Sequence, residues 1–226
     1  MDINEYVHDY ALTAYSFDGN AEDNTIAELI YKNVKGKKVL DLGCGPTEPV
    51  LSIFYPEAKE VVAVDRLQEN ISFTKKNNER LLGGIIERAM AYKQSHLSKR
   101  GVKPKVRYVL GGVTKRLKLG KSDSAMQIGC FGCLGTRKDF ELAVKNAYRY
   151  LKDRGTLLMV NWEIGEARED PNRPYYADRP LEVGNLYVPA LREAGFEIKR
   201  LGSMSRLKKE SKDAGFSKMI WAVARK

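Results

Sequence analysis

The chain lacks the features that mark membrane, secreted or disulfide-stabilised proteins. It has three cysteines in 226 residues, which are too few for a disulfide scaffold. It contains no apolar run of about eighteen residues, so we expect no membrane-spanning helix and no membrane partner. The first five residues lack the basic and apolar regions of a signal peptide. These absences predict a cytoplasmic protein.

The composition is that of a globular enzyme-sized domain rather than a disordered chain. Apolar residues make up 43% of the sequence and charged residues 30%, which is enough to build a sizeable core. No internal repeat or low-complexity segment interrupts it. We therefore expect one domain over residues 1–226 and, by default, a monomer.

Acidic residues are scarce in one part of the chain. Segment 80–121 holds twelve basic residues and a single acid, Glu87, although the whole chain carries only +10. Such a segment attracts polyanions, nucleic acid among them. A lysine-rich solvated surface also explains it, and the segment contains no interleaved arginine-aromatic recognition motif. The solvated surface is the favoured interpretation, with nucleic acid as the alternative partner.

Hydrophobic periodicity predicts alternating strands and helices. Strands are expected at residues 38–42, 60–64, 106–110, 124–129, 156–160, 196–201 and 219–224. Helices are expected at residues 21–34, 49–55, 68–82, 85–97, 139–151 and 183–194, with Gly83 and Gly84 dividing the third helix from the fourth.

This order predicts an α/β fold with a doubly wound, mainly parallel seven-stranded sheet of Rossmann-like type. No helix is expected between the last two strands, so they should form an antiparallel hairpin at one edge. The aromatic-rich segment 1–35 is expected to cap a ligand. Segment 161–180, which is polar and contains Pro171 and Pro174, is expected to be a loop that covers a substrate.

A glycine turn follows the first predicted strand, and an acid ends the second. The turn is Gly43-Cys44-Gly45, preceded by Asp41, and the distant acid is Asp65. In parallel sheets ligands bind at the carboxyl ends of strands, where glycine lets the backbone approach them closely. A carboxylate at the second strand end can accept both hydroxyl groups of a ribose. The spacing therefore predicts a nucleoside site.

The turn lacks the third glycine of a dinucleotide-binding fingerprint. Glu48 and Pro49 stand where a phosphate would need neutral N–H donors, because one carries negative charge and the other has no N–H. Asp41 adds another negative charge, which suits a cationic ligand. A nucleoside with a sulfonium and no phosphate, S-adenosylmethionine, is favoured over a nicotinamide dinucleotide.

The motif Val-Leu-Asp-Leu-Gly-Cys-Gly at residues 39–45 resembles the first motif of class I S-adenosylmethionine-dependent methyltransferases. Its extension, Gly45-Pro46-Thr47, resembles the narrower nicotinamide, phenylethanolamine and thioether N-methyltransferase group. The resemblance covers nearly the full chain, although only the glycine motif is specific. It implies a methyltransferase that acts on a small molecule, at nitrogen.

The resemblance implies a set of cofactor-binding residues. An N-terminal tyrosine that holds the methionine carboxylate would be Tyr6, and Asp65 would hold the ribose. An acid expected after the third strand is replaced by Gly112, followed by Val113, so backbone groups there would hold the adenine. The remaining implied cofactor contacts are Gly43, Gly45, Thr47, Arg66, Asn70, Gly129 and Cys130.

The residues expected near the methyl acceptor differ from those of this N-methyltransferase group. Asn161 stands where the group has an acid, and Glu163 follows two residues later. Methyl transfer from a sulfonium is a direct in-line displacement that needs no metal, so catalysis can come from alignment. An amine must be neutral to attack, and Glu163, Tyr10 and His8 could accept or relay its proton. The catalytic candidates are Tyr10, Asn161 and Glu163.

Two further patterns leave alternatives open. Cys130 and Cys133 form a C-x-x-C, which lacks partners for a zinc site and is interpreted as small buried residues beside the cofactor, with a redox pair as the alternative. The whole pattern also fits an RNA or protein methyltransferase that uses segment 80–121. A non-catalytic nucleotide-binding protein on the same fold is the third hypothesis.

Overall fold

One seven-stranded sheet organises the molecule. The computed structural model describes residues 15–76, 79–97, 104–164, 183–213 and 215–226. The strand order is β3-β2-β1-β4-β5-β7-β6, in which β7 runs antiparallel to both neighbours and the other pairs are parallel. The strands are β1 (Lys38–Leu42), β2 (Glu60–Asp65), β3 (Lys105–Leu110), β4 (Ser122–Ile128), β5 (Leu151–Ile164), β6 (Glu197–Met204) and β7 (Phe216–Arg225). The predicted fold class is confirmed.

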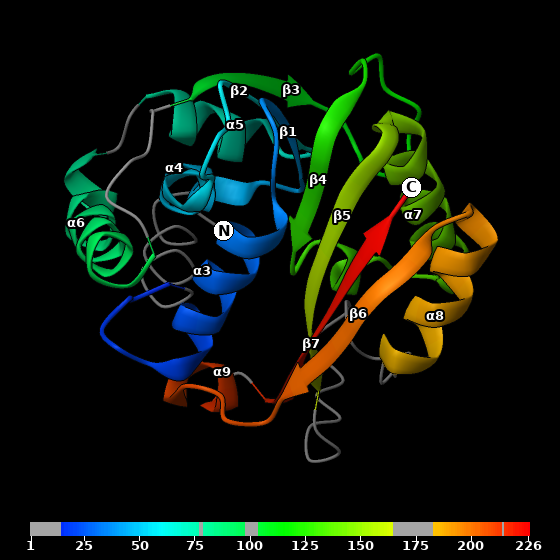
Figure 1. Ribbon diagram of the computed structural model, residues 1–226. Coiled ribbons are helices and arrows are strands. Elements are labelled where there is room, and N and C mark those ends of the chain that lie inside the picture. The colour runs from blue at the N-terminus through cyan, green and yellow to red at the C-terminus, as the bar shows by residue number, and fades with distance from the viewer. Residues whose placement is uncertain (1–14, 77–78, 98–103, 165–182, 214) are drawn as a thin grey trace.

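Both faces of the sheet are covered, because successive apolar residues of a strand point to opposite faces. In β2, Val61 and Ala63 belong to one hydrophobic cluster, whereas Val62 and Val64 belong to the other. The first face packs against α3 (Ala21–Asn33), α4 (Glu48–Leu51) and α6 (Glu79–His96), and the second against α7 (Arg137–Tyr150) and α8 (Val183–Ala194). Figure 1 shows the two layers on opposite sides of the strands.

The chain changes direction between β1 and β4, which lie side by side in the middle of the sheet. From β1 the chain winds outward through β2 and β3, and then returns to β4 and β5. The carboxyl ends of β1 and β4 therefore diverge into connections on opposite sides. This topological switch point is where open α/β sheets bind ligands.

Gly83 and Gly84 do not divide two helices as predicted. They lie inside α6, and the break falls earlier, because α5 (Gln68–Lys75) ends before them. A glycine in a helix interior costs about 1 kcal/mol relative to alanine. Here Leu82, Ile85 and Ala89 are buried on one face of α6, and this packing outweighs the weak helix propensity of the two glycines.

The end of the chain also differs from prediction. Residues 161–164, expected to begin a loop, continue β5 because they pair with the first half of β7. Residues 165–182 lie outside the described part of the chain. A short helix, α9 (Lys209–Asp213), stands between β6 and β7, where none was predicted.

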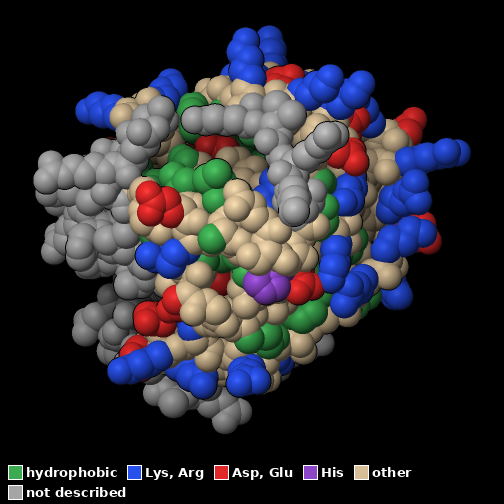
Figure 2. All heavy atoms as spheres, turned by 60° about the vertical axis from the view of Figure 1, so that its left-hand side comes forward, with side chains coloured by type: hydrophobic (Ala, Val, Ile, Leu, Met, Phe, Trp, Pro, Cys, Tyr) green, Lys and Arg blue, Asp and Glu red, His purple; other side chains and the backbone are tan. Residues whose placement is uncertain are grey.

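Basic side chains are spread over the surface rather than gathered from segment 80–121 alone. Figure 2 shows Lys and Arg around the rim of the face that carries α6. Within the segment, Lys93 is buried and donates to the Ile53 carbonyl at 2.5 Å, and Arg88 donates to the Ser16 carbonyl at 2.5 Å. Part of the segment's charge is thus used in packing α6. In the described residues, no helix combines the length and apolarity that crossing a membrane requires.

Candidate cofactor site

The turn after β1 is shaped by two glycines in the left-handed region of backbone space. Gly43 has φ 76° and Gly45 has φ 56°. The N–H groups of Gly43 and Cys44 both donate to the Val64 carbonyl, at 2.8 and 3.0 Å, which ties the turn to β2. A Cβ on Gly43 would lie 2.1 Å from the Cys130 Sγ, whereas a Cβ on Gly45 would meet nothing within 4 Å. Gly43 is therefore needed for packing, and Gly45 keeps open the space above the turn.

Asp65 holds the turn as well as ending β2. One carboxylate oxygen accepts from the Gly45 N–H at 2.9 Å. The other accepts from the Leu67 N–H at 2.9 Å and from the Asn70 side chain at 3.2 Å. These bonds fix the carboxylate at the carboxyl end of the strand, next to the glycine turn. Asp65, Gly45 and Asn70 are thus brought together as the sequence suggests.

Two more acids lie buried beneath this turn. Asp41 and Glu48 are almost fully buried, and Glu48 accepts a hydrogen bond from the Tyr108 hydroxyl at 2.9 Å. Asp41 Oδ2 has no hydrogen-bond partner among the described residues. Burial, followed by the nearby charges of Glu48 and Asp65, raises the pKa of Asp41 well above its ordinary value of 3.8. A cationic ligand over the turn would relieve this repulsion.

The raised pKa gives a testable pH dependence. The folded protein holds a proton on Asp41 that the unfolded chain releases near pH 4, so the free energy of unfolding should fall as pH rises from about 4 through the folded-state pKa. Asp41→Asn removes this term, and the difference between variant and wild type should grow with pH, by up to about 1.4 kcal/mol per pH unit. Urea denaturation of both proteins across this pH range measures the difference in free energy of unfolding. A difference that does not change with pH would show that Asp41 is ionised in the free protein.

The turn after β4 faces the glycine turn. Gly129 and Cys130 begin it, and it continues as a short 3-10 helix, η4 (Phe131–Cys133). The Cys130 sulfur packs against Gly43, and burial raises the pKa of its thiol. Cys133 is exposed, and all three cysteines are free thiols. The predicted burial is therefore wrong for Cys133, whereas Cys130 packs against the glycine turn and its contact with a cofactor stays a prediction.

Asn161 is engaged by the protein itself. Its side-chain oxygen accepts from the Gly132 N–H at 2.9 Å, and its side-chain nitrogen donates to the Tyr187 hydroxyl. The residue is completely buried. Asn161 therefore anchors the turn after β4 to α8. Its predicted contact with an acceptor stays a prediction.

Glu163 lies further along β5, at its carboxyl end. It is half-buried and forms an ion pair with Lys218 of β7, at 2.7 Å. Tyr6 and Tyr10, the predicted carboxylate-binding and catalytic tyrosines, lie outside the described residues.

The remaining predicted contacts are placed as follows. Thr47 is buried, and its hydroxyl donates to the Cys44 carbonyl at 3.5 Å. Arg66 is exposed directly after Asp65. Val113 is buried, and its carbonyl accepts from the Asn146 side chain of α7 at 3.0 Å. The Val113 carbonyl is thus already bonded to the protein.

Two exposed leucines near Asp65 were not among the predicted site residues. Leu67 is 42% exposed and follows Asp65 by two residues, and Leu110 is 54% exposed and pairs with Asp65 across β2 and β3. Large apolar side chains left open at strand ends suit the flat face of a base. Both leucines lie at or just after the end of a predicted strand, near Asp65, and this position in the sequence could have indicated them.

A buried polar cluster joins the start of α3 to the end of β5. Glu22, in the first turn of α3, accepts from the Trp162 indole at 2.8 Å and from the Ser211 hydroxyl at 2.7 Å. Its neighbour Asp23 forms an ion pair with Lys208 at 3.1 Å, and both of these side chains are buried. Removing one partner of a buried ion pair leaves the other charge buried without compensation, which is strongly destabilising. The cluster therefore fixes α3 against the carboxyl edge of the sheet.

The residues present fit S-adenosylmethionine. The space above Gly45 admits a ligand close to the backbone, and Asp65 is positioned to accept from a ribose. The unsatisfied Asp41 oxygen and the neighbouring acids suit a cation. Pro49 removes one N–H from the next helix, so the turn makes a poor phosphate cradle.

Comparisons with known proteins agree with this geometry. Residues 17–216 match the profile of a methyltransferase domain family. No curated protein sequence matches the chain. Solved structures do, among them an S-adenosylmethionine-dependent methyltransferase from Methanosarcina mazei, at 16% identity over 88% of this chain and 96% of that one, with a TM-score of 0.61.

Two further solved structures are also similar to the chain. A TehB-like S-adenosylmethionine-dependent methyltransferase from Corynebacterium glutamicum is 19% identical over 99% of this chain and 97% of that one, with a TM-score of 0.61. The N-methyltransferase NodS from Bradyrhizobium japonicum, in complex with S-adenosylhomocysteine, is 12% identical over 96% and 98%, with a TM-score of 0.58. Because this profile covers most of the chain, the chain belongs to the methyltransferase domain family, and it has the fold of S-adenosylmethionine-dependent methyltransferases.

Proposed function

We propose that the protein transfers the methyl group of S-adenosylmethionine to a nitrogen atom of a small molecule by direct in-line displacement. The observation that carries the proposal is the segregation of charge between the two edges of the sheet. At the carboxyl edge, Asp65 and Glu163 carry the negative charge, and Glu48 and the protonated Asp41 lie buried beneath the glycine turn. An edge lined by acids attracts a protonated amine and repels a phosphate backbone.

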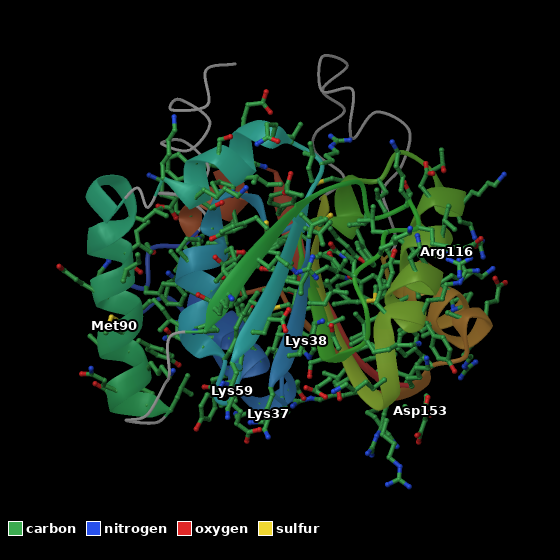
Figure 3. The ribbon with its side chains drawn as sticks, turned by 90° about the horizontal axis from the view of Figure 1, so that it is seen from above. Lys37, Lys38, Lys59, Met90, Arg116 and Asp153 are labelled. Carbon is green, nitrogen blue, oxygen red and sulfur yellow. The ribbon has the colours of Figure 1, made fainter. Side chains whose placement is uncertain are left out.

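Basic residues begin the strands at the opposite edge. Lys37 and Lys38 precede or begin β1, and Lys59 precedes β2, with its N–H donating to the Lys37 carbonyl at 2.8 Å. Figure 3 shows these three lysines next to one another. A polyanion attracted to this edge would lie a strand length from the glycine turn, roughly 17–20 Å for five or six residues. This separation favours a small acceptor over RNA.

The residues at the carboxyl edge have separate roles in the proposed reaction. When bound, the cofactor supplies an activated methyl group on a sulfonium. Glu163, held by Lys218, is the described residue we propose to take the proton from the acceptor nitrogen. Tyr10 is the second candidate for this proton. Asn161 acts by fixing the turn of Gly129 and Cys130, which faces the glycine turn. Kinship with the nicotinamide and phenylethanolamine group is part of this proposal.

The test is methyl transfer from labelled S-adenosylmethionine to two separate pools, a metabolite extract and total RNA. Label is expected in the extract, in compounds that contain an amine or ring nitrogen. Gly45→Ala is the control, because its Cβ would clash with no described residue and its positive φ costs about 1–2 kcal/mol. That variant should fold and lose at least about tenfold in transfer.

Label in RNA would overturn the small-molecule assignment. Label on oxygen or sulfur alone would overturn the nitrogen assignment. Unchanged transfer by Gly45→Ala would show that the cofactor does not lie over the turn.

A further inference from the structure

A basic groove lies at the edge of the sheet opposite the cofactor site. It has a volume of about 540 Å³ and sits between the end of α3 and the amino ends of β4 and β5, with β6 and β7 alongside. Five of its lining residues are cationic, and one is acidic, Asp123. The cations are Lys32, Lys35, Arg154, Lys199 and Arg225.

The single acid in the groove is already neutralised. Asp123 forms an ion pair with Lys152 at 2.6 Å and accepts from the Lys38 N–H at 2.8 Å. Lys32 and Lys199 pair with exposed acids beside them on their own elements, Glu28 and Glu197. Exposed pairs of this kind are weak. The groove therefore keeps an excess of positive charge.

The two arginines carry most of this excess. Neither Arg154 nor Arg225 forms an ion pair with a described acid. Guanidinium groups bind phosphate oxygens with two parallel hydrogen bonds. Outside the groove, the neighbouring cations Lys38 and Arg107 lie near Glu60, at 3.7 and 3.9 Å. Within the groove, Arg154 and Arg225 thus lack the acidic neighbours that Lys32 and Lys199 have.

Arg154 occupies a backbone conformation that favours glycine. Its φ is 63°, and it is one of two non-glycine residues with positive φ among the described residues. Its N–H donates to the Lys226 carbonyl at 3.0 Å, and the Lys226 N–H donates to the Gly155 carbonyl at 2.9 Å. A Cβ on Gly155 would lie 2.8 Å from the Lys152 carbonyl oxygen, so the tight turn is imposed by packing. The backbone of Arg154 is therefore fixed at the groove, and its exposed side chain is free to reach a ligand there.

We propose that this groove binds a phosphate-bearing anion of nucleotide size, with Arg154 and Arg225 holding its phosphate groups. Its volume falls in the range of small-molecule sites, about 300–1,000 Å³. An open groove of this volume with five cations along it fits a di- or triphosphate, whereas a long strand needs a basic track longer than the groove. The site goes beyond the proposed methyl transfer, because it lies at the other edge of the sheet from Gly45 and Asp65.

Calorimetric titration of the full chain with inorganic tripolyphosphate and with ATP tests the proposal. Both should bind at one site, and saturating S-adenosylhomocysteine should change their Kd by less than about twofold. Arg154→Gly should lower the affinity for both at least tenfold and leave Tm unchanged or higher, because glycine accepts the positive φ. Arg116→Gly removes the same charge from an exposed loop away from the groove and should change the affinity by less than about twofold (Figure 3).

Several outcomes would overturn the proposal. The first is no binding of either anion. The second is an equal loss in both variants, which would indicate general electrostatic attraction. The third is competition with S-adenosylhomocysteine, which would place the anion at the cofactor turn. Tighter binding of a twenty-nucleotide RNA than of ATP, with the same dependence on Arg154, would replace the small ligand by a nucleic acid. None of these readouts depends on methyl transfer, so failure here leaves the proposed function untouched.

Discussion

Asp65→Ala is expected to weaken S-adenosylmethionine binding by at least about a hundredfold. The carboxylate is positioned to accept from the ribose, and hydrogen bonds to a charged group are worth about 1.5–3 kcal/mol each. The variant should also lose about 1–3 kcal/mol in free energy of unfolding, because the N–H groups of Gly45 and Leu67 lose their acceptor. Calorimetry measures the affinity and urea denaturation the stability.

Asp123→Ala is the matched control for this prediction. Asp123 also accepts from a backbone N–H, that of Lys38, and pairs with Lys152, but at the opposite edge of the sheet. It should therefore lower the free energy of unfolding while leaving the affinity for the cofactor unchanged. Equal affinity of wild type and Asp65→Ala would refute the ribose assignment. Equal loss of affinity in both variants would mean that lost stability alone weakens binding.

Gly43→Ala should produce the largest loss of stability, about 2–5 kcal/mol in free energy of unfolding. Its Cβ would lie 2.1 Å from the Cys130 Sγ and 2.4 Å from the Cys130 Cβ, so one of the two turns must move. The positive φ of 76° adds about 1–2 kcal/mol. Because the two turns face each other beside the cofactor site, cofactor affinity should fall as well.

Gly120→Ala separates the two causes. Gly120 has nearly the same φ, 74°, but its Cβ would meet only the Lys38 Nζ, at 3.5 Å. The difference between the two variants measures the clash with Cys130 alone. Cys130→Gly removes both clashing atoms, so combining it with Gly43→Ala should recover part of the lost stability. Equal losses at Gly43 and Gly120, or no recovery in the double variant, would show that the two turns are not in contact in solution.

Neighbours in the chain were enough to predict the strands, the order of elements and the glycine turn. The unbroken apolar run from Val61 to Val64 already indicates a strand buried on both faces. Gly43, Gly45 and Asp65 belong to one strand-helix-strand unit, so their meeting follows from short-range periodicity. The same reasoning misplaced a helix break at Gly83, because the packing of Leu82 and Ile85 outweighs the propensity of glycine.

Contacts between distant segments decided the rest. Asn161 bonds to Gly132 and Tyr187, which come from two other elements, and the basic groove gathers side chains from α3, β5, β6 and β7. Local periodicity says which face a residue occupies, but not which residue opposes it. The pKa of Asp41 and the strain at Arg154 arise from burial and packing, which exist only once the chain has folded.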